Sequence, residues 1–203
     1  MIKTIFCDLG NVIVLVDHQK TIQGLSRFSS RSEDAIYRFF LNSKARKRFD
    51  TGKITAEKFF MNFKDNLGLK LDFDRFRKIW CSCLINLNKD MEKLLRKLKK
   101  NYRLILLSNT DEIHFAYCRE NYRILDVFDD FVLSYEEGYV KPNPMIYLGA
   151  LKKAGTFPTN TVFIDDIAKH TIAARLLGIK GIQKYAKIKE RFKGIECKGL
   201  KSK

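Results

Sequence analysis

The chain has 203 residues, enough for one well-buried domain with an elaboration and too few for two large domains. Hydrophobic residues make up 45% and charged residues 31%, with only 3 prolines and 11 glycines, which excludes collagenous, disordered and low-complexity chains; no apolar run approaches the ~20 residues that span a bilayer. The 39 Lys and Arg residues outnumber the 23 Asp and Glu residues, and the net charge of +16 attracts anions such as phosphorylated metabolites, nucleic acid or acidic membranes.

Short apolar runs bounded by polar residues are typical of parallel strands buried on both faces. Four such runs occur, at Ile2–Cys7, Leu104–Leu107, Phe131–Leu133 and Val162–Ile164. Helical patterns lie between them: Asn88 predicts the cap of one helix and Pro144 the first residue of another. This alternation predicts an α/β fold in which a parallel sheet carries helices on both faces.

The stretch from residue 17 to residue 88 breaks the alternation. Aromatic and aliphatic residues recur at helical spacing, as in Ile36, Phe39, Phe40, then Phe59, Phe60, Phe63, then Phe73, Phe76, Ile79, Trp80. Gly52 and Gly68 mark turns, and Thr55 marks a helix start. We predict a small all-helical cap over residues 17–88, inserted after the first strand of a core that comprises residues 1–16 and 89–203.

Polar clusters follow the predicted strands at their carboxyl ends, the edge at which open parallel sheets bind ligands. The clusters are Asp8, Ser108-Asn109-Thr110, Lys141-Pro142 and Asp165-Asp166. Gly10 and Asn11 predict a tight loop after Asp8, with backbone amides that can approach a phosphate. The four clusters therefore predict one site at this edge of the sheet.

The residue types in these clusters indicate the ligand. Lys141 offers a compact positive charge for a phosphoryl group. The adjacent carboxylates of Asp165 and Asp166 repel one another unless a cation or hydrogen-bond donors compensate them. Magnesium prefers oxygen ligands, and Asp8, a backbone carbonyl and one of the acidic pair would provide them. A site for phosphate and Mg²⁺ is the prediction.

With these motifs in this order, the chain resembles the haloacid dehalogenase superfamily from Ile2 to about Gly181. The matching pieces are Asp8-Leu-Gly-Asn-Val, Leu107-Ser-Asn-Thr110, Lys141-Pro142 and Phe163-Ile-Asp-Asp166. The helical insertion resembles the family's cap of the first type, and the core would be Rossmann-like. The first motif, together with Phe49-Asp-Thr-Gly-Lys-Ile-Thr55, is most similar to bacterial sugar-phosphate phosphatases active on glucose 1-phosphate.

The resemblance implies a phosphatase in which Asp8 attacks phosphorus and water hydrolyses the resulting aspartyl-phosphate. A small phosphorylated metabolite, first of all a sugar phosphate, would be the substrate. The implied catalytic residues are Asp8, Ser108 and Lys141, and the implied phosphate-binding residues are Leu9, Gly10, Ser108, Asn109 and Lys141. Mg²⁺ would be held by Asp8, the carbonyl of Gly10 and Asp166, with Asp165 as a ligand or close neighbour. His170 is expected to be a structural helix residue.

One position departs from the family's phosphatases, most of which carry a second aspartate two residues after the nucleophile. Gly10 stands there, so an acid that protonates the leaving oxygen is missing. A good leaving group, a metal-bound water or a residue of the helical cap domain would substitute for the missing acid. Asp17 and Asp111 are carboxylates in nearby loops, but each is expected to be a turn residue or the N-cap of a helix.

The same departure leaves two other functions open. One is a metal-independent 2-haloacid dehalogenase, against which Asp165-Asp166 argues because the pair would repel a carboxylate substrate. The other is a catalytically weak protein that keeps the fold for binding or regulation.

Two groups of basic residues remain. In the cap, Arg46 and Arg48 are candidates for contacting the substrate, with ordinary helix surface as the alternative. Residues 180–203 hold nine basic and two acidic residues, an expected surface tail with nucleic-acid binding as the minority alternative. Five cysteines without a Cys-x-x-Cys pair, and the absence of a signal peptide, predict a reducing cytoplasm. The oligomeric state stays open.

Overall fold

The computed structural model describes residues 1–183. The basic residues after Gln183 lie outside the described residues, and so does Cys197. The prediction of nucleic-acid binding, which rests on the basic tail, therefore also lies outside them. Within the described range, every helix is too short or too polar to cross a bilayer.

A five-stranded sheet forms the centre of the molecule. Its strands are β1 (Thr4–Cys7), β4 (Arg103–Ser108), β5 (Asp130–Leu133), β6 (Thr161–Ile164) and β7 (Lys180–Ile182). They are arranged in the order β5-β4-β1-β6-β7, and every neighbouring pair is parallel. The predicted parallel α/β sheet is confirmed. Strand β7 was not predicted, because three residues that include Gly181 give no apolar run.

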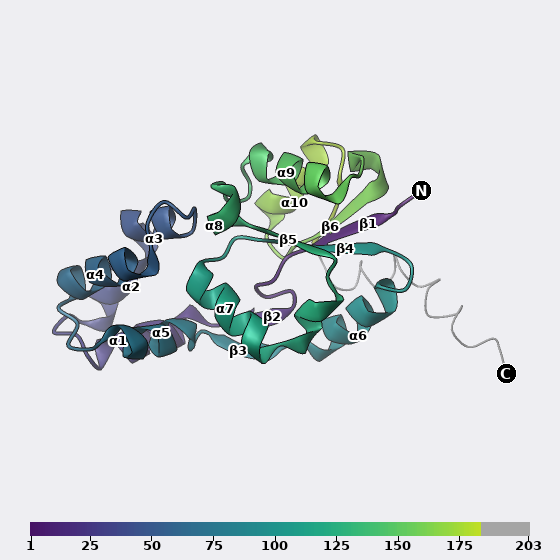
Figure 1. Ribbon diagram of the computed structural model, residues 1–203. Coiled ribbons are helices and arrows are strands. Elements are labelled where there is room, and N and C mark those ends of the chain that lie inside the picture. The colour runs from purple at the N-terminus through teal and green to yellow at the C-terminus, as the bar shows by residue number, and fades with distance from the viewer. Residues whose placement is uncertain (184–203) are drawn as a thin grey trace.

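Helices cover both faces of the sheet, as expected. On one face lie α6 (Lys89–Leu98), α7 (Glu112–Asn121) and the 3₁₀ turn η1 (Arg123–Val127); on the other lie α9 (Pro144–Ala154) and α10 (Ala168–Leu176) (Figure 1). The short helix α8 (Ser134–Glu137) follows β5, and the 3₁₀ turn η2 (Pro158–Asn160) precedes β6. Asn88 caps α6 by accepting the amide of Met91, and Pro144 opens α9, so both predicted helix starts are confirmed.

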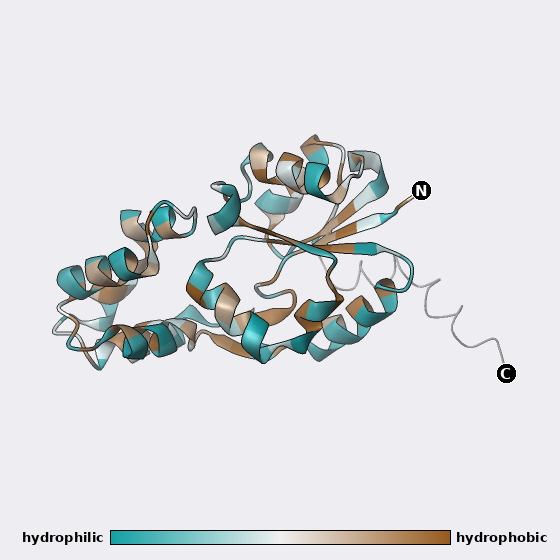
Figure 2. Cartoon of the chain, viewed as in Figure 1, coloured by the Kyte–Doolittle hydropathy of each residue, from teal (hydrophilic) through white to brown (hydrophobic). Residues whose placement is uncertain are grey.

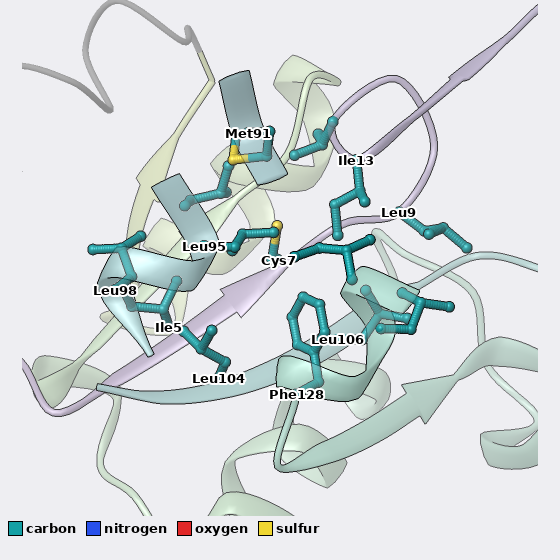
Figure 3. Close-up of a cluster of buried hydrophobic side chains, with 14 of the residues drawn as sticks. Ile5, Cys7, Leu9, Ile13, Met91, Leu95, Leu98, Leu104, Leu106 and Phe128 are labelled. Atoms are coloured by element: carbon teal, nitrogen blue, oxygen red, sulfur yellow. The ribbon is translucent and has the colours of Figure 1, made fainter. Parts of the chain in front are cut away.

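The side chains of each strand alternate between two apolar clusters. Ile5 and Cys7 pack with Leu104, Leu106 and the α6 residues, as Figure 3 shows. Phe6 points the other way and packs with α9 and α10. The middle stretches of the central strands are brown in Figure 2 and their polar residues lie at the strand ends, whereas the helices show brown and teal stretches along their length, the pattern of a sheet buried on both faces. This double burial fixes the register, so the carboxyl ends of β1, β4 and β6 meet at one edge.

Five helices lie between β1 and α6: α1 (His18–Ser26), α2 (Glu33–Asn42), α3 (Lys44–Phe49), α4 (Ala56–Leu67) and α5 (Phe73–Cys81). They lie together at the left of the sheet in Figure 1 and have their own core, in which Phe59, Phe63 and Trp80 are fully buried. Thr55 caps α4, as expected. We call α1–α5 the cap.

The cap is joined to the core through a two-stranded antiparallel ribbon that the sequence did not predict. It pairs β2 (Val14–Val16) with β3 (Leu84–Leu87). Strand β3 falls inside the predicted range 17–88, so that range is not helical throughout. Its residues are mostly half-buried, which is why its short run carries no clear strand signal. The division at residues 16/17 and 88/89 stays a prediction.

Candidate active site

Asp8 lies at the carboxyl end of β1 in a tightly hydrogen-bonded loop. Its amide donates to the carbonyl of Ile164 at 2.9 Å, and its Oδ1 accepts the amide of Leu9 at 2.8 Å. The carbonyl of Leu9 in turn accepts the amides of Ile13 and Val14, and Asn11 adopts a left-handed φ of 54°. These bonds hold the Asp8 side chain, which is only 11% exposed, at the sheet edge.

Lys141 connects the predicted clusters. Its ammonium is buried and lies 2.8 Å from Asp8 Oδ1, 2.7 Å from Asp165 Oδ2 and 3.0 Å from the carbonyl oxygen of Leu107. Burial disfavours the charged form, but the two carboxylates outweigh it and raise the pKa of Lys141 above its ordinary value of 10.5. Lys141 is therefore a fixed cation beside the candidate nucleophile.

Asp165 is fully enclosed by donors. Besides Lys141, it accepts the amide of Ile167 at 2.8 Å, and Nδ1 of His170 lies 3.1 Å from each of its oxygens. Burial opposes ionisation, yet His170 and Lys141 lower the pKa of Asp165 below its usual range. Because its oxygens already have partners, this geometry favours a positioning role for Asp165. His170 sits on α10, as expected for a helix residue, and orients that carboxylate.

A carboxylate cluster at this edge fits a divalent cation. Oxygens of Asp8, Asp165 and Asp166 lie within 4.8 Å of one another, with one ammonium among three carboxylates. Burial raises the pKa of Asp8, with Asp165 adding to the rise and Lys141 opposing it; burial and Asp165 likewise raise that of Asp166. A hard cation would relieve this repulsion, and carboxylate oxygens are the ligands that Mg²⁺ prefers.

The last residue of β4, Ser108, and the loop after it, with Asn109 and Thr110, lie at the same edge. Ser108 is buried yet lines the cleft beside Asp8. The side chain of Asn109 makes two hydrogen bonds to the backbone of Lys141. Its Oδ1 accepts the Lys141 amide at 2.7 Å, and its Nδ2 donates to the Lys141 carbonyl at 3.0 Å. The side chain of Asn109 thus positions the lysine loop, which leaves its backbone amide for the predicted contact with phosphate.

A cleft of about 290 Å³ lies between this edge and the cap. Its floor holds Asp8, Gly10, Ser108, Lys141 and Asp166, so the core residues predicted from the four clusters come together, with Leu9 and Asn109 also in the wall. Asp165 lies beneath, bonded to Lys141.

The cap contributes His18, Arg46 and Asp50 to the same cleft. Arg46 stacks over Phe40 at 3.9 Å, and its Nε lies 4.0 Å from Asp50 Oδ2. Arg48, the other predicted cap residue, is exposed and does not line the cleft, because two residues further along α3 the side chain points to another face.

A second buried polar network closes the cap onto the core. Asp111 Oδ2 accepts Nε1 of Trp80 at 3.0 Å and lies 2.7 Å from Nδ1 of His114, while Asp111 Oδ1 caps α7. Nε2 of His114 lies 3.4 Å from Sγ of Cys83. Burial opposes the shift, but hydrogen bonds from His114 and His18 lower the pKa of Cys83 from 9.0 to about 6. Asp111 is thus the structural N-cap residue of α7, as expected.

Asp111→Ala should destabilise the protein by about 3–5 kcal/mol, because it removes a helix cap and takes their shared acceptor from the buried Trp80 and the half-buried His114. The matched control is Asp17→Ala, since Asp17 caps α1 through the amide of Gln19 alone and should cost about 1 kcal/mol. Urea unfolding followed by fluorescence of Trp80, the only tryptophan in the chain, measures both. Equal losses in the two variants would contradict the buried network.

Sequence reasoning missed His18, Asp50, Cys83 and His114 as residues of the cleft. No local pattern marks them, since they come from α1, the end of α3, the residue before β3 and α7, which meet only after folding. The one signal available was the motif from Phe49 to Thr55, which contains Asp50.

Comparison with known proteins gives a single family. The family model for haloacid dehalogenase-like hydrolases matches residues 2–178. Two enzymes align at 27% identity: a D-ribitol-5-phosphate phosphatase of Bacteroides thetaiotaomicron, over 90% of this chain and 92% of that protein, and a sesquiterpene phosphatase of Aspergillus oryzae, over 89% and 88%.

A solved structure shares the fold. It is a family enzyme of Bacteroides thetaiotaomicron in complex with magnesium and inorganic phosphate, 29% identical, with a TM-score of 0.84 over 92% of this chain and 96% of that one. The similarity therefore covers both the sheet and the cap.

Proposed function

Because the chain belongs to the haloacid dehalogenase-like hydrolase family, we propose that it is a Mg²⁺-dependent phosphatase of small phosphorylated metabolites, with sugar phosphates foremost. The observation that carries the proposal is the cleft floor, where the ammonium of Lys141 lies 2.8 Å from Asp8 and Asp166 completes a carboxylate cluster. A nucleophilic carboxylate, a fixed cation and a cation site in one cleft are the parts that phosphoryl transfer needs.

The residues divide the chemistry as follows. Asp8 attacks phosphorus, and the bond from phosphorus to the leaving oxygen breaks, which gives an aspartyl-phosphate that water hydrolyses in a second step. Lys141 and Ser108 stabilise charge on the phosphoryl oxygens. Bound by Asp8, Asp166 and the Gly10 carbonyl, Mg²⁺ would supply further positive charge there. Asp165 and Asn109 hold Lys141 in place.

The relatives support the substrate class. One is named for a polyol phosphate and the other for a sesquiterpene, and the structural relative was solved with magnesium and phosphate. For this chain, the polar cleft wall formed by His18, Arg46 and Asp50 favours a hydrophilic leaving group such as a sugar or polyol over a terpene. Asp166 beside Asp8 argues against a carboxylate substrate, and so against a dehalogenase.

A panel of phosphate esters and 2-haloacids, assayed with Mg²⁺ and with chelator, tests the proposal. Phosphate release that needs Mg²⁺ and no halide release are expected. Release of halide, or turnover of esters that is indifferent to chelation, would overturn it.

The four cysteines of the described part are free thiols and buried, which accords with our further proposal that the protein works in a reducing cytoplasm.

Asp166→Asn should raise the Mg²⁺ concentration needed for half-maximal activity by about 10-fold or more, because a neutral amide binds a hard cation more weakly than a carboxylate. Calorimetric titration with Mg²⁺ measures the same loss without substrate. Asp126→Asn, on an exposed carboxylate, is the control and should change neither value. An unaltered Mg²⁺ affinity in Asp166→Asn would refute the assigned ligand.

Arg46→Ala should lower kcat/KM about 10-fold or more for esters whose leaving group carries a second anionic group, because it removes a charge-assisted hydrogen bond from the cleft wall. Arg48→Ala is the matched control from the same helix and should leave the kinetics unchanged. Steady-state kinetics on a monoanionic and a dianionic leaving group separate the two. The assignment of Arg46 fails if both variants behave alike.

A further inference from the structure

The loop after β1 supplies no acid for the leaving oxygen. Gly10 occupies the position two residues after Asp8, and a Cβ built there would meet only Val16 Cγ2, at 3.6 Å. That is an ordinary contact, and the backbone of Gly10 does not lie in the left-handed region. Neither space nor backbone strain demands glycine, so the missing carboxyl is a chemical gap that another part of the cleft can fill.

Among the described residues that line the cleft, four carry a carboxyl: Asp8, Asp50, Asp111 and Asp166. Asp8 is the nucleophile, and Asp166 belongs to the cation site. Asp111 is committed to Trp80, to His114 and to the cap of α7. Asp50 remains, and it approaches from the cap, the side on which a leaving group would lie.

The surroundings of Asp50 suit proton transfer. It follows the last residue of α3 and is half-buried, and its amide donates to the carbonyl of Arg46 at 2.8 Å. Its carboxylate makes only a long contact of 4.0 Å with Arg46, so it is not locked in a tight ion pair. Burial raises the pKa of Asp50 to about 6; Arg46, His114 and His18 oppose the rise, and Asp111 adds to it. A carboxyl with such a pKa both gives and takes protons near neutral pH.

We propose that Asp50 is the general acid and base of this site and supplies from the cap the carboxyl that the β1 loop lacks. The proposal rests on the proposed phosphatase function. In the first step, Asp8 bonds to phosphorus while the bond to the leaving oxygen breaks, and protonated Asp50 gives its proton to that oxygen. In the second, the Asp50 carboxylate takes a proton from water as its oxygen bonds to phosphorus and the bond to Asp8 breaks. Asp50 ends protonated, and phosphate leaves.

The dependence on the leaving group tests this role. An alkyl phosphate such as a polyol phosphate needs a proton on its leaving oxygen, whereas p-nitrophenyl phosphate releases a stable phenolate without one. Asp50→Asn should therefore lower kcat/KM for the alkyl ester by about 10²–10⁴-fold and change kcat/KM for the nitrophenyl ester by less than about threefold. With the nitrophenyl ester the second step should become slow, so that a burst of one phenolate per enzyme precedes a reduced kcat.

Three further variants sharpen the result. Asp50→Glu should recover part of the alkyl-ester activity, and Asp65→Asn, on an exposed cap carboxylate, should match the wild type on both esters. In the wild type, kcat/KM for the alkyl ester should fall as the pH rises above about 6 and Asp50 loses its proton. If Asp50 only anchored Arg46, then Asp50→Asn and Arg46→Ala would each lower kcat/KM for the alkyl ester and for the nitrophenyl ester by the same factor.

Such equal losses, or unchanged alkyl-ester kinetics in Asp50→Asn, would overturn the assignment while Mg²⁺-dependent turnover by the wild type upheld the phosphatase. A wild type that turns over neither ester would overturn the proposed function and the role of Asp50 with it.

Discussion

Asp8→Asn is expected to reduce the turnover of every phosphate ester by about 10⁴-fold or more, the scale of removing a nucleophile. The amide has nearly the shape of the carboxylate and can still accept the amide of Leu9, so the β1 loop should keep its form. Phosphate release in the steady state measures the loss. Trapping of the phosphorylated intermediate after acid quench should succeed with the wild type and fail with the variant.

The control is Asp65→Asn, which makes the same chemical change on the exposed face of α4 and should leave turnover intact. If Asp8→Asn keeps more than a few per cent of the wild-type rate, Asp8 is not the nucleophile. In that case another oxygen of the cleft would have to attack phosphorus.

Lys141→Met is expected to abolish turnover and also to destabilise the fold by about 3–5 kcal/mol, because it leaves the carboxylates of Asp8 and Asp165 buried without their cation. Denaturant unfolding measures the second effect independently of activity. Lys152→Met, on the exposed side of α9, is the matched control and should change stability by less than about 0.5 kcal/mol.

The contribution of Lys141 to stability has a definite pH dependence. The folded-state pKa lies above the ordinary value of 10.5, so the contribution is complete below that pH and is lost as the pH rises through the folded-state pKa. The difference between wild type and Lys141→Met should therefore persist through neutral pH and shrink in strong alkali, where Lys141 loses its proton, and in strong acid, where Asp165 gains one. A variant as stable as the wild type at neutral pH would show that the ion pairs do not hold this edge together.

Local patterns were sufficient for the framework of the sheet and for most of the core site. The apolar runs before Asp8, Ser108 and Asp165 form parallel strands, since each run is buried on both faces and its polar neighbour begins the loop. Helix N-cap residues such as Asn88 and Thr55 predicted helix starts, because their side chains accept hydrogen bonds from backbone amides only a few residues away.

Elements with weak burial were missed. The ribbon of β2 and β3 and the short strand β7 are mostly half-buried or partly exposed, so their sequences lack the apolar contrast that reveals a strand. They acquire their form from pairing with a partner: β7 pairs with β6, and β3 pairs with β2 across almost seventy residues of chain.

The sequence by itself determined where Asp8, Ser108 and Asp166 would meet, because parallel strands must present their carboxyl ends at one edge. Lys141 was predicted to follow a strand directly, but α8 separates it from β5. It did not determine which cap residue faces them. Arg46 and Arg48 are alike in sequence, and only the packing of α3 turns one into the cleft and the other to solvent.

The raised pKa of Asp50 also depends on the tertiary structure. A carboxyl in the chain has an ordinary pKa until folding removes it from water and places it beside Arg46, His18, Asp111 and His114. Arg46 is one helical turn away, but His18, Asp111 and His114 come from segments far apart in the sequence, so no local pattern predicts their distances from Asp50 or its burial. The glycine at position 10 shows that an acid is missing from the β1 loop, and the packing of the cap over the sheet edge brings the Asp50 carboxyl into the wall of the same cleft.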